Sequence, residues 1–519
     1  MGKLKKQFKA ARRASVPIIG IRSFDQEATY KDLFDAFLGK APTYCWDLLN
    51  GASPMNEHAT QALVIVADSM NAIGDPIEWF AQTTAMNPVE ILKLAPKLPR
   101  DTVLFMQNAQ RFVAEPMVAQ AIMNLRSSFE KKGNMLVLLG PDFDIPAELQ
   151  QDVVLLEEDL PSEEEYAGIT AELMSGNDLP QPSTEDLSKA SILLKGLMPF
   201  RAKQTAAMSM TKNGLDLAAL REFKRQAIAE HRGITMDEDN PNLTFENIGG
   251  LGEVTSFFHR VMTGAEPPNS VFRIDELEKA LAGAGGRNSE GDSSGTSHDM
   301  LLNFLNAIED KGWSFSIFIG PGGSGKSLVT KCLGPTYGIP SFTVDLGATK
   351  GPLVGESQQN IRTLLSVMDG IAGKDALIIG TCNKLESIPP ELKRRVTDGF
   401  WFFDIPKAEE LVSIWSINMR QFGITEQPIP PCTNWTGAEV RTCCRLARKL
   451  RCSLEQASKY VVPIWLSGQQ SIQELRNMAH ETFLDASAPG SYRKPVLTST
   501  ATPKEEIPTG RTLRLREEE

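Results

Sequence analysis

The sequence predicts an α/β protein made of two successive units, each with a mostly parallel sheet and a helical region after it. Three observations predict this fold class. Short apolar segments alternate with amphipathic helical segments, as in sheets whose parallel strands are joined by helices. A glycine-rich loop at residues 320–327 joins one apolar segment to a helix. The same order of strand, loop and strand also recurs in both halves of the chain.

Length and charge set the first limits. A chain of 519 residues is long enough for about two to four domains, each with its own core. The net charge of -11 argues against a general nucleic-acid surface. Basic residues gather at the N-terminus, and we interpret this arm as a solvated tail in preference to a nucleic-acid or membrane contact. These residues are Lys3, Lys5, Lys6, Lys9, Arg12 and Arg13.

Hydropathy and cysteine usage favour a cytoplasmic protein. No apolar run approaches the roughly 20 residues of a membrane span, and the N-terminus lacks the apolar core of a signal peptide. We therefore expect no membrane contact and a cytoplasmic location, which is the host cytoplasm if the protein is viral. The seven cysteines form no CxxC pair and the chain has five histidines, so we expect reduced thiols and no zinc site.

The first unit alternates strands with helices. Strands are expected at residues 16–21, 44–47, 101–106, 135–139 and 153–156. Helices are expected at residues 28–38, 60–73 and 117–129, and another begins near Ser162 with acidic residues in its first turn. A linker with Pro180 and Pro182 then leads to a helical region over residues 185–230.

The second unit starts near residue 242. Strands are expected at residues 315–319, 342–345, 376–379 and 400–403, and helices at 300–308, 328–333 and 358–368. The stretch 283–295 is rich in glycine and serine and predicts a mobile loop. Residues 409–483 predict a second helical region. The tail beyond it is rich in Pro, Thr, Arg and Glu, which is typical of disorder.

An internal repeat connects the two units. One copy, MLVLLGPDFDIPAELQQDVVLLEEDLPSEEE, begins at Met135, and the other, ALIIGTCNKLESIPPELKRRVTDGFWFFDIPKAEE, begins at Ala376. Both run strand, loop, Ile-Pro-x-Glu-Leu, strand and a proline-initiated acidic helix. Short apolar strands can match by chance, but the shared order, with the motif at residues 145–149 and 388–392, favours a duplication.

The glycine-rich loop GPGGSGKS has the pattern of a phosphate-binding loop. Its glycines let successive backbone N–H groups turn toward phosphates, its lysine reaches the β and γ phosphates, and its serine hydroxyl can bind Mg²⁺. A chance glycine-rich turn is the alternative, and the strand before the loop and the helix after it disfavour that alternative. The predicted nucleotide-binding residues are Gly320, Pro321, Gly322, Gly323, Ser324, Gly325, Lys326, Ser327 and Leu328.

Further motifs, taken with this loop, resemble the AAA family of ATPases. They are FENIGGL at 245–251, LVGES at 353–357 with NIR at 360–362, TCN at 381–383 and PPELKRR at 389–395. The first half is similar to the degenerate ATPase-like half of two-part AAA proteins of plastids, cyanobacteria and phages. The resemblance implies a P-loop NTPase sheet with a helical lid, preceded by a degenerate ATPase-like α/β domain. It also implies ATP and Mg²⁺ as ligands.

One departure from the family concerns its acidic strand, which normally follows the phosphate loop. Nothing acidic occupies that place here, and the good candidate lies upstream, in VFRIDE at residues 271–276. We infer a permuted order, which lengthens two crossovers and leaves both right-handed. The apolar residues of this segment also fit an amphipathic helix, and Arg273 is awkward in a buried strand. Asp345 is the weaker alternative to Asp275 as the acidic partner.

The resemblance implies roles for the candidate catalytic residues. Ser327 would hold Mg²⁺ directly and Asp275 would hold it through water, Glu276 would orient and deprotonate the attacking water, and Asn383 would help to place that water. Arg394, with Arg395, resembles an arginine finger given to a neighbouring subunit, which requires a homo-oligomer; the family resemblance implies a ring of six. Residues 396–398 lack the family's second finger arginine. The alternative for residues 393–395 is a solvated basic cluster.

Other positions limit the function. Residues 353–355 fall where the family carries its central-pore loop, and they lack the aromatic residue that usually grips a threaded polypeptide. Arg441 resembles a lid arginine that touches phosphate, and a surface role is an equal alternative. In the first half no phosphate loop follows residues 16–21, and Gln107 and Asn108 stand where an acidic pair would be needed. We therefore expect a structural or partner-binding first half.

Three functions remain open. We favour an ATP-hydrolysing oligomeric motor that remodels a protein or protein complex. The alternatives are an ATP-binding switch or scaffold with little hydrolysis, and a nucleic-acid-associated ATPase supported by the basic arm alone. The expected division is a basic arm (1–15), a degenerate ATPase-like domain (16–180), a helical subdomain and linker (181–240), an AAA nucleotide-binding domain (241–407), a helical lid (408–485) and a disordered tail (486–519).

Overall fold

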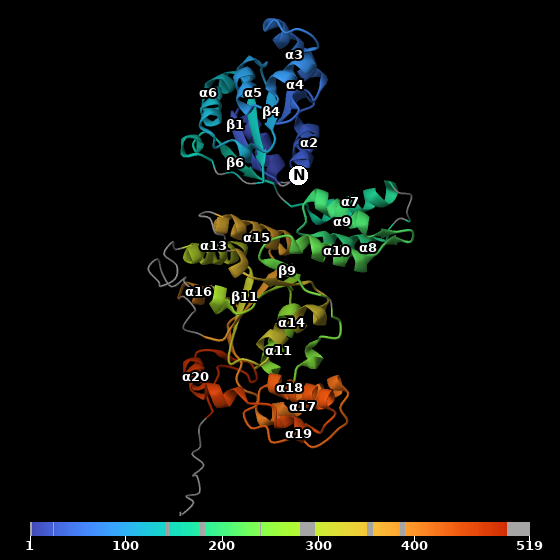
Figure 1. Ribbon diagram of the computed structural model, residues 1–519, viewed down its shortest axis with the longest axis vertical. Helices are drawn as coiled ribbons and strands as arrows, with labels where there is room; N and C mark the ends of the chain where they lie inside the picture. Colours follow the sequence, from blue (N-terminus) through green and yellow to red (C-terminus); the bar gives the residue numbers. More distant parts are fainter. Residues whose placement is uncertain are drawn as a thin grey trace, which may run out of the picture. The chain divides into compact units, whose positions relative to one another are not determined.

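The chain forms two compact units in the computed structural model (Figure 1). One comprises Met1–Met236 with Arg362–Gly373, and the other comprises Asp237–Ile361 with Lys374–Glu519. The structure describes residues 3–495 apart from 24, 142, 144, 159, 177–179, 181, 239, 281–295, 350–355 and 385–389. Each unit has its own sheet and its own apolar core.

The first unit is built on a six-stranded sheet in the order β3-β2-β4-β5-β1-β6. β2 and β3 are antiparallel, and all other neighbouring pairs are parallel, which confirms the predicted α/β class. The strands are β1 (Ile18–Arg22), β2 (Thr43–Asp47), β3 (Gly51–Pro54), β4 (Val103–Met106), β5 (Met135–Gly140) and β6 (Val154–Glu157). The helices between them are α2 (Gln26–Phe37), α3 (Glu57–Ser69), α4 (Pro76–Thr84), α5 (Pro88–Leu94) and α6 (Pro116–Lys132), with short 3-10 turns η1 (Ala95–Lys97), η2 (Ala109–Arg111) and η3 (Ala147–Leu149).

The core of this unit occupies both faces of the sheet. Every residue of β4 and β5 is buried, as expected for parallel strands covered on both sides. Trp46 of β2 is fully buried, and its indole Nε1 donates a hydrogen bond to the carbonyl oxygen of Thr84 at 2.8 Å. Large side chains such as this one each stabilise the fold by about 1.5–3 kcal/mol.

The basic N-terminal segment is a packed helix, α1 (Lys3–Arg13). Its apolar face consists of Leu4, Phe8 and Ala11, all buried in the core of the first unit. Lys5 pairs with Asp32 at 2.7 Å, and Arg12 donates to the carbonyl oxygen of Gly133 at 3.1 Å. The solvated-tail interpretation is therefore wrong, because apolar residues spaced four and three apart form one helical stripe. The nucleic-acid hypothesis loses support, since two of the basic groups have partners within the unit.

Three elements between β2 and β4 were not predicted: β3, α4 and α5. Asp75 caps α4 and Asn87 caps α5, and each is followed directly by a proline at the first helical position. An Asp or Asn before a proline is a helix-start signal, because the side chain accepts backbone N–H bonds and the proline needs none. This signal in the sequence could have found both helices.

The helix predicted to begin near Ser162 is present, and the region predicted as helical, residues 185–230, carries three more helices. In chain order these helices are α7 (Glu163–Gly176), α8 (Thr184–Leu194), α9 (Pro199–Met208) and α10 (Leu217–Ala229), with a small hairpin of β7 (Met210–Thr211) and β8 (Gly214–Leu215) before α10. Tyr166 is buried and donates to the carbonyl oxygen of Leu197 at 2.7 Å, which ties α7 to the turn after α8. β9 (Ile234–Met236) follows.

The strands of the second unit lie in the order β15-β14-β11-β13-β10-β12, with parallel neighbours. They are β10 (Ser270–Ile274), β11 (Ser314–Ile319), β12 (Ser341–Val344), β13 (Ala376–Cys382), β14 (Phe400–Phe402) and β15 (Leu484–Asp485). The helices are α11 (Gly252–Met262), α12 (Leu277–Ala280), α13 (Thr296–Lys311), α14 (Lys326–Tyr337) and α16 (Pro390–Lys393), with 3-10 turns η4 (Phe245–Asn247) and η5 (Gly347–Thr349). Helix α15 (Glu356–Ala372) begins in this unit, and its residues from Arg362 belong to the first unit. The lid comprises α17 (Ala408–Phe422), α18 (Gly437–Leu450), α19 (Leu454–Ser458) and α20 (Ile464–Ala479).

β10 confirms the permuted order. It precedes the phosphate-loop strand β11 in the chain, yet it pairs with β13 on one side and β12 on the other. All five of its residues are buried, so the alternative of an amphipathic helix at this place is wrong. The acidic residues that follow β10 therefore emerge at the same edge of the sheet as the phosphate loop and the end of β13.

Arg273 is accommodated in this buried strand by a set of polar partners. Its guanidinium donates to both carboxylate oxygens of Asp237, at 2.8 and 3.1 Å, and to the hydroxyl of Thr343 at 2.5 Å. The side chain is 5% exposed, and a bidentate carboxylate is the partner that satisfies a buried guanidinium best.

The chain beyond the lid is folded as far as it is described. Tyr492 is buried, its ring lies 4.4 Å from that of Phe402, and its hydroxyl donates to Asp404 at 2.6 Å. The prediction of disorder is therefore wrong for residues 486–495, and residues 496–519 lie outside the described part. The predicted mobile loop at 283–295 also lies outside it. No helix in the described ranges combines the length and apolar character needed to cross a bilayer.

Candidate active site

The phosphate loop connects β11 to α14, as predicted. Gly323 and Gly325 have left-handed backbone angles, with φ of 78° and 103°. A Cβ at Gly325 would lie 2.9 Å from Cδ1 of Leu251, and one at Gly323 would lie 2.8 Å from Oγ1 of Thr436. Each of these two positions therefore requires glycine for two reasons: the left-handed backbone conformation and the lack of space for a side chain. Because Gly325 precedes α14, no side chain caps the first turn of this helix.

Lys326 is buried inside the loop. Its Nζ donates to the carbonyl oxygens of Gly320 at 2.7 Å and Pro321 at 2.8 Å. Burial lowers the pKa of Lys326 to about 8, and the negative charge of Glu278 opposes this shift. A phosphate placed against the loop would favour the charged ammonium, since an opposite charge at close range restores the protonated form.

The acidic pair lies directly beside the loop. Oδ1 of Asp275 accepts hydrogen bonds from the Ser327 hydroxyl at 3.4 Å and from the Thr381 hydroxyl at 3.2 Å. Glu276 has a left-handed φ of 54°, and its backbone N–H donates to Thr381 Oγ1 at 3.2 Å. Asp275 thus meets a hydroxyl 52 residues later in the chain. A carboxylate and a hydroxyl are the hard oxygen ligands that Mg²⁺ prefers, so this donor set fits the metal.

Asn383 follows β13 and lines the same cavity, together with Thr381. Its backbone N–H and its side-chain Nδ2 both donate to Oε1 of Glu278, each at 3.1 Å. Glu278 was not among the predicted site residues. It is the third acidic residue of the run DELE at 275–278, and this run is the sequence feature that could have indicated it.

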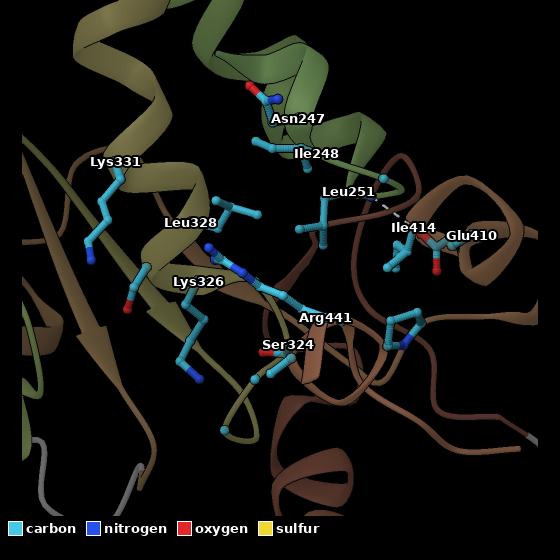
Figure 2. Close-up of a pocket in the computed structure, with 18 of the residues that line it drawn as sticks. Asn247, Ile248, Leu251, Ser324, Lys326, Leu328, Lys331, Glu410, Ile414 and Arg441 are labelled. Carbon is cyan, nitrogen blue, oxygen red and sulfur yellow. Dashed lines mark hydrogen bonds between the residues drawn. The ribbon is translucent and has the colours of Figure 1, made fainter. Parts of the chain in front are cut away.

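A cavity of about 600 Å³ opens over the loop, within the range of pockets that hold small ligands. Figure 2 shows Ile248, Leu251 and Ile414 lining one part of it, and Lys326, Lys331 and Arg441 lining another. Leu251 donates its backbone N–H to Glu410 at 3.4 Å, which connects the start of α11 to the lid. The cavity therefore combines apolar walls with cationic side chains and with the acidic pair Asp275 and Glu276.

Arg441 reaches this cavity from α18 in the lid, and its side chain extends toward Leu328 at the start of α14 (Figure 2). Of the two alternatives for Arg441, this position favours contact with phosphate. Asp345, the weaker candidate for the acidic partner, lies elsewhere and accepts a hydrogen bond from the backbone of Ala348 at 3.1 Å.

The two candidate finger arginines do not line the cavity of their own chain. Arg394 is exposed. Arg395 donates to Glu309 at 2.9 Å and to Asn306 at 3.1 Å, both on α13. Action on a neighbouring subunit stays a prediction for Arg394, and Arg395 would first have to leave α13. The predicted pore-loop residues 353–355 lie outside the described residues, as does the start of the motif at 388–392.

Comparison with known proteins finds relatives that are similar to both halves of the chain. A family model described as the SpoVK-like AAA ATPase, N-terminal domain, matches residues 4–158, so helix α1 is part of the matched region. A protein of Guillardia theta named uncharacterized AAA domain-containing protein ycf46 is 22% identical, over 91% of this chain and 94% of the relative. Proteins of the same name from Trieres chinensis and Pyropia yezoensis are 22% and 20% identical, over 65% and 76% of this chain and 69% and 85% of the relatives. Together with the phosphate loop and the acidic strand in one sheet, these similarities support an AAA family ATPase.

Proposed function

We propose that the second unit hydrolyses ATP with Mg²⁺. The observation that carries this proposal is the contact between Ser327, the last residue of the phosphate loop, and Asp275, the first residue of the acidic pair. The metal would be held between this hydroxyl and this carboxylate, and it would neutralise charge on the β and γ phosphates. Lys326 would add a second positive charge at the same phosphates once they displace the carbonyl groups that now accept its hydrogen bonds.

Glu276 is the proposed general base. Its left-handed backbone turns the chain at the end of β10, and it lines the cavity beside Asp275, Thr381 and Asn383. In the proposed step the water oxygen bonds to the γ-phosphorus and a water proton passes to the Glu276 carboxylate. The bond from the γ-phosphorus to the bridging oxygen breaks, and ADP leaves with the electron pair. Asn383 would hold the water in line.

We propose further that the active form is a homo-oligomer that remodels a protein or protein complex. Support comes from Arg394, which is exposed and absent from the cavity of its own chain, so that a neighbouring chain could receive it. Charge on the transferred phosphoryl group is what an arginine supplied by a neighbour would stabilise. The absence of an aromatic residue from 353–355 supports work on a folded partner in preference to threading.

Steady-state ATP hydrolysis by three variants tests the proposal. Glu276→Gln should lower kcat by about 100-fold or more and retain ATP binding, since general-base catalysis contributes that much. Lys326→Ala should lose both activity and binding. Glu266→Gln, an exposed carboxylate outside the cavity, serves as the matched control and should behave as wild type. A wild type that binds ATP yet is as inactive as Lys326→Ala would replace the motor with a switch or scaffold.

A further inference from the structure

Glu278 lies behind the wall of the cavity. Asn383 lines the cavity, whereas Glu278 does not. One oxygen of Glu278, Oε1, accepts from both the backbone N–H and the side-chain Nδ2 of Asn383, at 3.1 Å each. The carboxylate therefore grips Asn383 at two points and fixes both its backbone and its side-chain torsion.

The charge of Glu278 decides which way the Asn383 amide faces. A carboxylate only accepts hydrogen bonds, so the amide end that meets it must be the NH₂ group. The carbonyl Oδ1 projects from the same carbon at roughly 120° to Nδ2, and it is consequently turned away from Glu278. Asn383 then offers its side-chain carbonyl as an acceptor that a water proton can use.

The environment of the second carboxylate oxygen of Glu278 supports a role in addition to holding the backbone after β13. Among the described residues, Oε2 is buried and has no hydrogen-bond partner. A buried carboxylate oxygen without a partner is costly, and a role in the site is one explanation for such a group.

We propose that Glu278 is a positioning residue for hydrolysis, which holds the Asn383 amide with its carbonyl oxygen as the acceptor for the attacking water. This inference rests on the proposed ATP hydrolysis. Glu278 acts through Asn383 and has no contact with the substrate. Its removal should therefore slow the chemical step and leave ATP binding nearly intact.

A double-mutant cycle measures this coupling. Glu278→Ala should lower kcat by about 10- to 100-fold, the loss typical of a misplaced catalytic group, and change the Kd for a fluorescent ATP analogue less than about threefold. In an Asn383→Ala background the same change should have little further effect on kcat, because the group that Glu278 orients is already gone. Glu278→Gln should retain most activity, since its amide oxygen can accept both hydrogen bonds.

Each outcome bears on the inference. An active wild type with an unchanged Glu278→Ala variant overturns the inference and leaves the proposed function intact. Equal losses of kcat with and without Asn383 overturn it too, because Glu278 would then act independently. If Glu278→Ala weakens ATP binding as much as it lowers kcat, and thermal unfolding shows lost stability, the role is structural. A wild type without hydrolysis overturns both the inference and the proposed function.

Discussion

Each unit contains a strand-to-helix junction at the same place in its sheet. We call the junction open where no side chain caps the helix, as in the second unit, and closed where a side chain caps it, as in the first unit. In each unit, a strand at the same place in the sheet order leads into a helix: β1 lies between β5 and β6, and β11 lies between β13 and β14. The first turn of α14 has no side-chain cap. The first turn of α2 is capped by Asp25, whose carboxylate accepts from the backbone N–H of Ala28 at 3.1 Å.

At the closed junction, carboxyl groups of the chain itself lie at the helix end. Thr29 donates to Glu158 at 2.8 Å, and Asp25 lies at the same helix end. A helix N-terminus attracts anions, and here a side chain of the chain itself meets that demand. Two sheets with the same central strand order therefore differ at this helix end, because a few residues after one strand decide whether a side chain caps it.

The comparison extends to the acidic strand. β4 and β10 occupy corresponding places, between β2 and β5 in one sheet and between β12 and β13 in the other. Asn108 and Glu276, each the second residue after its strand, share a left-handed backbone with φ of 53° and 54°. The backbone turn is thus the same in both units, while the carboxylates are present in the second unit alone. Gln107 and Asn108 therefore stand in the first unit where Asp275 and Glu276 stand in the second.

ATP stoichiometry tests this comparison most strongly. Wild type should bind one ATP per chain, and Lys326→Ala should lower affinity by about 100-fold or more, the cost of removing a charged donor from a buried site. Arg22→Ala removes the basic residue at the end of β1, where it pairs with Glu157 at 2.8 Å, and should leave ATP binding unchanged. Isothermal titration calorimetry provides the numbers. Two sites per chain, or weaker binding in Arg22→Ala, would contradict the closed state of the first junction.

The next largest effect is expected for a substitution in the acidic pair that follows the permuted strand β10. Asp275→Asn should raise the Mg²⁺ concentration needed for tight ATP binding on the order of tenfold, as expected for a group that orients metal ligands. Asp345→Asn is the matched control, because Asp345 caps Ala348 outside the cavity. Titrating Mg²⁺ against binding of a fluorescent ATP analogue measures both. An effect in Asp345→Asn that exceeds the effect in Asp275→Asn would reassign the acidic partner.

Much of this site could be predicted, because its parts are contiguous in sequence. The phosphate loop could be recognised from eight consecutive residues. The acidic strand could be recognised from the segment VFRIDE, because nothing acidic follows the phosphate loop at the usual place. The contact between Glu278 and Asn383 could not be read, since it joins residues 105 apart and depends on the register of two strands. Helix α1 was missed for another reason: six basic residues dominated its composition, and its buried stripe of three apolar residues is visible only at helical spacing.

A smaller effect is expected for two glycine variants, which distinguish backbone strain from steric crowding at the open junction. Gly325→Ala forces a left-handed residue, which costs about 1–2 kcal/mol of folding free energy, and adds a methyl group 2.9 Å from Leu251 at the cavity. Gly338→Ala at the other end of α14 also forces a left-handed residue, with no neighbouring atom within 4 Å. Both variants should lose stability in chemical denaturation, and Gly325→Ala should lose more, because its φ of 103° lies further from the usual left-handed values than the 69° of Gly338. Gly325→Ala alone should lose ATP affinity, and equal affinities would show that this glycine serves folding only.

The smallest effect lies in the closed junction and depends on pH. Burial raises the pKa of Glu158 to about 7, with Ser23 and Thr29 opposing the shift through hydrogen bonds and Asp25 adding to it. A carboxyl whose pKa is raised on folding gives stability that is fully present below its unfolded pKa of about 4.5 and is lost as the pH rises through about 7. Glu158→Gln removes this dependence, because a neutral amide keeps an acceptor oxygen for Thr29 and cannot ionise. The variant should therefore unfold at about the same denaturant concentration as wild type at pH 5, and the first unit should gain about 1–2 kcal/mol over wild type at pH 8. A gain of equal size at both pH values would mean that packing, and not the buried charge, limits the stability of the closed junction.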